Sequence, residues 1–199
     1  MSPRSRTDAL LSFWFGEKTD PDYGRYKKVW FQKNAEFDAQ IRQLFLADVE
    51  RAAAGDYDSW QASPPSAVAL LLLLDQFPRN LYRQDPRSFA TDAKALRVAQ
   101  SLVKTDADKT LIPAQRFFVY VPFEHSELLI HQKQCVSLMR ALNETCPDLD
   151  PGLKNGLDYA IRHRDIIARF GRFPHRNEIL GRESTPEELL FLQQPGSRF

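Results

Sequence analysis

The segment at residues 162–182, RHRDIIARFGRFPHRNEILGR, concentrates groups that could bind an anion or move a proton. It contains six Arg and two His against only two acidic residues. The arginine guanidinium is a planar fork of donors that suits bidentate binding of carboxylate or phosphate. Histidine changes its charge near neutral pH and can act as a general base. This composition predicts either a site or an unusually polar core.

All four histidines lie between residues 125 and 175. Glu124, His125 and Glu127 open a predicted helix that also contains His131, and a spacing of four places Glu127 and His131 on one face. A carboxylate beside an imidazole can orient a base or bind a metal. There is no second Glu-x-x-His helix, no HExxH and no Cys/His cluster, so we expect no metal and no cofactor. The alternative is that both acids merely favour a helix N-terminus.

The next long helix is predicted to place His163 on an otherwise apolar face. A neighbouring stripe alternates in charge, at Asp158, Arg162, Asp165 and Arg169. One interpretation is a hydrogen-bonded core histidine beside a surface charge ladder, and the other is a base with its orienting carboxylate. The catalytic candidates from the two helices are His125, Glu127, His163 and Asp165.

Two short segments share the order Phe-Pro followed by Arg-Asn: DQFPRN at 75–80 and GRFPHRN at 171–177. Proline disfavours helical conformation at the residue before it, so both segments are expected to end a helix. Their polar side chains would then cap the helix ends or frame one pocket, in which case Arg79 and Arg176 lie close together. The candidate ligand-binding residues are Arg79, Asn80, Glu124, Arg169, Arg172, His175, Arg176 and Asn177.

The composition is that of one soluble globular domain over residues 1–199, with 43% hydrophobic and 27% charged residues. A net charge of +1 gives no overall attraction to nucleic acid or anionic membrane. The longest apolar run, 67–74, is far shorter than the ~20 residues that cross a bilayer. We identify no signal peptide, and two cysteines without a CxxC motif are typical of a reduced, cytoplasmic protein.

Hydrophobic spacing and capping residues predict an all-α protein of roughly eight to ten helices joined by short loops. Residues 119–121 are the best strand candidate and are too short to form a sheet. The expected helices cover residues 7–16, 34–54, 67–74, 85–104, 113–120, 124–142 and 150–170, with a last one starting at 184.

Several motifs along the chain are longer than any one helix requires: SFWFG (12–16), the Trp30-Phe31 pair, LLLLDQFPRNLYR (71–83), VPFEHSE (121–127) and RHRDIIARFGRFPHRNEILGRESTPEELLFL (162–192). Together they resemble an uncharacterised bacterial family, domain of unknown function 924. The resemblance spans nearly the whole chain and implies an all-α, tetratricopeptide-like superhelix of packed antiparallel helix pairs. The sequence itself shows no clear 34-residue repeat. The family has no established reaction, so the resemblance leaves the mechanism open.

Three functions remain open. The first is a binding module whose Arg, His and Asn residues hold an anionic small molecule or an acidic peptide. The second is a hydrolase or transferase acting on an anionic small molecule, with His125 or His163 as base, oriented by Glu127 or Asp165. The third is a purely structural ionic network. The sequence favours the binding module, and no P-loop, GxSxG or GxGxxG motif selects a reaction.

Overall fold

The computed structural model describes residues 5–197, and every regular element in that range is a helix, with no strand. The all-α prediction is therefore confirmed, and residues 119–121 are helical. The α-helices are α1 (Arg6–Phe15), α2 (Ala35–Ala54), α3 (Pro64–Leu71), α4 (Phe77–Leu81), α5 (Asp92–Lys104), α6 (Pro113–Glu124), α7 (Leu129–Thr145), α8 (Pro151–Lys154), α9 (Gly156–Phe170) and α10 (Pro186–Leu192). Short 3₁₀ turns lie between them at Lys28–Trp30, Asp58–Ala62, Pro86–Ser88, Ala107–Thr110 and Pro174–Arg176.

A continuous helical rod made of α3, a π-helical turn at Leu72–Gln76, and α4 passes through the core. The expected stop at the first Phe-Pro is wrong, because Phe77 is helical and the chain continues past Pro78. Proline has no N–H to donate and crowds the preceding turn of a regular helix. Here the preceding turn is wider, and the Phe77 N–H bonds to the Leu72 carbonyl five residues back. The π-helical turn thus accommodates the proline.

Aromatic side chains join the first helix to this rod and to α6. Trp14 of α1 lies 5.5 Å, centroid to centroid, from both Phe77 and Phe118. Trp30 lies 5.0 Å from Phe118, and its indole N–H donates to the Trp14 carbonyl. All of these side chains are buried, and such edge-to-face pairs add to the stabilisation from apolar burial. The N-terminal third is therefore packed tightly on the helices that carry the polar residues.

Helices with strong caps begin where the sequence predicts. The side chain of Asn34 accepts the Phe37 N–H at the start of α2, and Gly55 ends that helix with φ of +103°. Thr185 and Glu188 form a reciprocal capping box at α10. Such boundaries depend on groups only three residues apart, so local sequence determines them.

Three boundaries differ from expectation. The helix expected at 113–120 extends through Pro122 to Glu124, and His125 is its C-terminal cap. The following helix, α7, begins only at Leu129, so Glu124 and His125 belong to the end of one helix and not to the start of another. The helix expected from residue 85 starts at Asp92, after a 3₁₀ turn.

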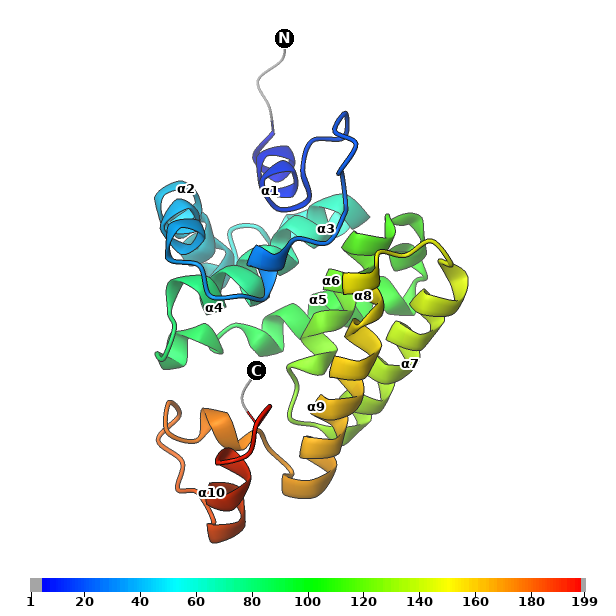
Figure 1. Cartoon of the computed structure of the whole chain (residues 1–199). Helices are drawn as coiled ribbons and strands as arrows, with labels where there is room; N and C mark the ends of the chain where they lie inside the picture. Colours follow the sequence, from blue (N-terminus) through cyan, green and yellow to red (C-terminus); the bar gives the residue numbers. More distant parts are fainter. Residues whose placement is uncertain (1–4, 198–199) are drawn as a thin grey trace.

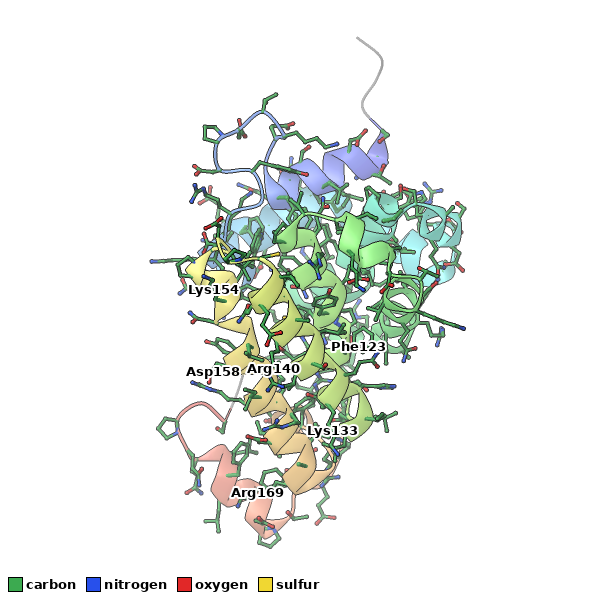
Figure 2. The ribbon with its side chains drawn as sticks, turned by 90° about the vertical axis from the view of Figure 1, so that its right-hand side faces the viewer. Phe123, Lys133, Arg140, Lys154, Asp158 and Arg169 are labelled. Carbon is green, nitrogen blue, oxygen red and sulfur yellow. The ribbon has the colours of Figure 1, made fainter. Side chains whose placement is uncertain are left out.

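Helices α7 and α9 lie side by side along one edge of the molecule (Figure 1). Figure 2 shows the outer face of this pair, with Lys133 and Arg169 toward one end and Lys154, of the short helix α8, toward the other. The chain then turns away from α9 at Gly171 and forms α10 at the lower end of Figure 1. None of the helices in residues 5–197 has the length and apolar character needed to cross a lipid bilayer.

Replacement of Gly156 by Ala should destabilise the protein. A Cβ built there would lie 2.2 Å from Cε2 of Phe117, so the α9 backbone contacts that ring directly. Overpacking of a filled core costs about 1–3 kcal/mol, which exceeds the ~1 kcal/mol that Ala adds to helix propensity. Urea unfolding of Gly156→Ala should show a net loss of up to about 2 kcal/mol. The loss should shrink in a Phe117→Leu background, and an equal loss there would contradict the packing explanation.

Candidate functional site

Polar side chains from five parts of the fold meet beside the end of α6, and we call them the His125 cluster. Asp75 and Arg79 come from the π-helical turn and α4, Glu124 and His125 from the end of α6, and the remaining members from α5, α9 and the 3₁₀ turn that follows α9. The cluster comprises Asp75, Arg79, Asp92, Glu124, His125, His163 and Arg176. Asp92, Glu124 and His125 lie at helix ends, whereas Asp75, Arg79 and His163 lie within helical segments.

At its centre, His125 Nδ1 lies 2.7 Å from the Oδ1 atom of Asp75. Only 2% of the Asp75 side chain is exposed. Burial disfavours its charge, but the positive charge of Arg79 and the hydrogen bond from His125 outweigh burial and hold the pKa of Asp75 below its ordinary value. Gln76 Nε2 also donates to Asp75, at 2.5 Å. Asp75 is therefore a buried, ionised carboxylate that accepts the imidazole N–H.

His125 itself is held in the neutral form. Burial and the positive charge of Arg79 lower its pKa, although Asp75 acts in the opposite direction. A neutral imidazole that donates from Nδ1 keeps a lone pair on Nε2. Within residues 5–197 this Nε2 makes no hydrogen bond, and it is not a buried atom. The side chain keeps 14% of its surface exposed, so solvent can reach the lone pair.

Glu124 has the opposite character to Asp75. Burial, reinforced by the negative charge of Asp75, raises the pKa of Glu124 to about 8, so its carboxyl group is protonated at neutral pH. Its Oε1 lies 3.5 Å from His163 Nδ1, and in the described part of the chain its carboxyl oxygens form no hydrogen bond. The cluster thus contains a neutral acid and a neutral base on consecutive residues.

Arg79 and Arg176 meet at one carboxylate, as the repeated Phe-Pro motif predicts. Arg79 makes a bidentate pair with Asp92, at 2.8 and 2.9 Å, while Arg176 reaches the same carboxylate at 3.5 Å. Both guanidinium groups lie over the ring of Phe89. Their proximity is confirmed, but Arg79 arrives from within a helix and not from a helix end.

Of these two cations, Arg176 has the weaker ion pairing. Its side chain is 7% exposed and lies between the rings of Phe89 and Phe173, each 4.6 Å from the guanidinium carbon. Its Nε has no hydrogen-bond partner. Burial and the nearby Arg79 lower the pKa of Arg176 to about 10, so it stays charged at neutral pH. A buried cation with one long ion pair favours a neighbouring anion.

The expected catalytic pair of His163 and Asp165 is wrong. His163 is buried, with its Nδ1 2.8 Å from the Tyr159 carbonyl and its ring against Phe173. Burial lowers the pKa of His163 to about 3, so it is neutral throughout the physiological range. Asp165 lies on the outer surface of α9 and pairs with Arg164 at 2.7 Å. The helix geometry separates the two side chains because they are only two residues apart.

The pairing of Glu127 with a histidine is also wrong. Glu127 lies in the loop before α7, where it accepts the Phe173 N–H at 2.8 Å and binds Arg182 at 2.7 Å. His131 instead contacts Ser126 and Gln100. The carboxylate that orients His125 is Asp75, from a distant helix.

The remaining predicted ligand-binding residues lie outside the His125 cluster. Arg172 makes a bidentate pair with Glu188, and Asn177 donates to Ser184 and to Glu188. Arg169 pairs with Glu187 on the surface. Asn80 donates to Asp38, so the two Asn residues of the repeated motif do not share a pocket. His175 lies next to Phe173, at 5.6 Å between ring centroids.

Two acidic residues central to the cluster were not predicted as site residues. Asp75 directly follows five consecutive leucines, and an acid at the end of such a buried run was the available signal. Asp92 had no comparable signal, since it follows a loop and resembles any helix-opening acid. Among residues 5–197, no group of three or more His, Cys, Asp or Glu is arranged to hold a metal ion.

Comparison with known proteins places this chain in a family. The family described as "Bacterial protein of unknown function (DUF924)" matches residues 10–196. A solved structure of a protein of unknown function from Agrobacterium tumefaciens is 37% identical, with a TM-score of 0.79, over 94% of this chain and 96% of that one. No curated protein matches. The chain therefore belongs to the DUF924 family of bacterial proteins of unknown function.

Proposed function

We propose that the His125 cluster is the catalytic site of an enzyme that transfers protons during the hydrolysis of, or group transfer from, a small anionic molecule. The observation that carries the proposal is the opposite chemistry of two adjacent groups. His125 is a neutral base oriented by Asp75, and Glu124 is a carboxyl group that stays protonated at neutral pH. Environments that divide an acid and a base in this way are typical of acid–base catalysis.

In such a reaction, His125 Nε2 would accept the proton of an attacking water or hydroxyl group. The Glu124 O–H would give its proton to the leaving group. Asp75 would hold the imidazole with Nε2 as the acceptor and stabilise the imidazolium that forms. Afterwards His125 is protonated and Glu124 is ionised, and proton exchange with solvent restores both.

The surroundings of Arg176 favour a substrate that carries a negative charge. Arg79, Arg172 and Arg182 each make a bidentate pair with a carboxylate. Arg176 has only the 3.5 Å contact with Asp92 as an ion pair, and its Nε has no partner. Its planar fork, held between two phenyl rings, suits a carboxylate or phosphate group. Arg172 and Arg182 lie outside the His125 cluster, and their bidentate pairs are better explained as structural.

We infer a cytoplasmic location as well, because Cys135 and Cys146 are free thiols. The tetratricopeptide-like arrangement implied by the sequence resemblance also stays a proposal. It is supported by the packing of the successive long helices, α6 on α7 and α7 on α9.

A thermal-shift screen with phosphate, sugar phosphates, nucleotides and dicarboxylates tests the anion site. A ligand at 100 times its dissociation constant should add about 2.7 kcal/mol of apparent stability to the wild type. Arg176→Lys should bind more weakly by about 1–2 kcal/mol, because one bidentate contact is lost. Arg169→Lys is the matched control at an exposed pair and should respond as the wild type does.

With a ligand that the screen finds, His125→Gln should keep most of the binding and lose about 100- to 10,000-fold in turnover. Retained binding without turnover in the wild type would favour a binding module. If no anion stabilises the wild type, or if Arg176→Lys responds as well as Arg169→Lys, the anion site is excluded and the network is structural.

The raised pKa of Glu124 predicts a pH-dependent stability. The folded protein retains the Glu124 proton to about pH 8, whereas the unfolded chain releases it near pH 4.5. The stabilisation is fully present below pH 4.5 and decreases by about 1.4 kcal/mol per pH unit toward pH 8. Urea unfolding should therefore show wild type losing stability relative to Glu124→Gln between pH 5 and pH 8. Glu178→Gln, at an exposed position, should run parallel to the wild type. Parallel curves for Glu124→Gln would contradict the assignment.

The Asp75–His125 contact predicts the direction of a histidine titration. The carboxylate raises the pKa of His125 against burial and Arg79, so its removal should lower that pKa further. Asp75→Asn keeps the shape and a possible acceptor but removes the charge. The imidazole resonances of His125, followed by NMR, should titrate at lower pH in Asp75→Asn than in the wild type. An unchanged or higher midpoint would show that Asp75 does not act on His125.

A further inference from the structure

We propose that residues 171–197, here the C-terminal arm, form a cover that opens to admit substrate and closes over the His125 cluster, bringing Arg176 to the substrate's anionic group. The identity of the occupant rests on the proposed function, but the motion can be measured without it.

The arm supplies part of the cluster's surroundings. Figure 1 shows it in orange and red at the lower end of the molecule, below α4 and α5 and beside the end of α9. Phe173 packs on His163 and on the guanidinium of Arg176, and Arg176 reaches Asp92 of α5. When the arm moves away, the cluster loses both the phenyl ring and its under-compensated cation. When the arm returns, Arg176 again lies beside the proposed acid, Glu124, and the proposed base, His125.

The arm has its own internal bonds. The buried carboxylate of Glu188 accepts hydrogen bonds from Nε and Nη2 of Arg172, from the backbone N–H of Thr185 and from the side-chain amide of Asn177. Arg172 also donates to the Glu183 carbonyl. These bonds connect the start, the middle and the helix of the arm. The arm can therefore move as a unit without losing its internal structure.

The attachment to the body combines a small apolar cluster with a few ion pairs. The apolar part is a small cluster, separate from the main core, made of Ile166, Ile167, Phe170, Phe173 and Phe191. The polar part is the pair of Arg182 with Glu127, the Glu127 bond to the Phe173 N–H, the surface pair of Arg169 with Glu187, and the long contact of Arg176 with Asp92. The Arg169–Glu187 pair is exposed and contributes little, and the Arg182–Glu127 pair, about a quarter exposed, is partly screened by salt.

The connection to α9 is a single glycine in the left-handed region, Gly171, with φ of +71°. A Cβ there would meet no atom within 4 Å, so no neighbouring side chain is packed on Gly171. An unencumbered glycine between a rigid helix and a self-contained arm is suited to act as the pivot. The arm thus has a pivot, internal cohesion and a salt-sensitive attachment.

Hydrogen–deuterium exchange of the full chain, read by mass spectrometry, tests the cover. Amides in the arm should exchange faster than those in α6, and faster still when NaCl is raised from ~50 to ~500 mM. Glu127→Gln keeps the acceptor for Phe173 but loses the charge that holds Arg182. It should speed exchange in the arm by about 10-fold and leave α6 unchanged. Asp165→Asn is the control, because its pair with Arg164 lies within α9.

Exchange in the arm as slow as in α6 and insensitive to both salt and Glu127→Gln would overturn the cover. Faster exchange in α6 as well would mean that the whole protein had loosened, and would overturn it too. Adding inorganic phosphate as the probe should slow exchange in the arm of the wild type but not of Arg176→Lys. A salt-sensitive arm that phosphate leaves unchanged supports the cover and counts against phosphate as the anion in the proposed function.

Discussion

The arrangement of the polar core follows from the burial of one carboxylate, Asp75, at the end of a leucine run. A charge removed from water must be compensated by ion pairs and hydrogen bonds. Asp75 obtains them from His125, Gln76 and Arg79. Compensation then spreads outward, because Arg79 needs a second carboxylate, which Asp92 supplies and shares with Arg176. The same charge opposes ionisation of Glu124 and keeps it protonated.

The π-helical turn gives this chain of charges its geometry. Its extra residue shifts the helical register, so that Asp75 and Arg79 face the end of α6 while the backbone passes a proline without a break. Such turns are often found at functional sites, because their irregular hydrogen bonding is maintained only where surrounding packing requires it. Here the packing is a rod of leucines buried on all sides. Core and site therefore depend on the same segment.

Local signals in the sequence predicted what local interactions decide. The cap at Asn34 and the capping box at Thr185 mark real helix starts, and the helical spacing gave the all-α fold. The site required non-local information. The partner of His125 is fifty residues away, and Pro122 did not end α6 where a single-helix argument would end it. The repeated Phe-Pro motif identified two arginines that meet, although the helix stop expected at the first of them does not exist.

The charges of the His125 cluster sum to zero before anything binds, although Arg176 makes only one long ion pair within it. Two ionised carboxylates face two guanidinium groups, while the imidazoles and the remaining carboxyl are neutral at pH 7. An anion entering such a balanced interior would leave one excess negative charge in a poorly solvated place. It would raise the proton affinity of His125 and Glu124, so that binding carries protons from the buffer into the protein. Affinity for an anion would then increase as the medium becomes more acidic, and the heat of association would depend on the ionisation enthalpy of the buffer.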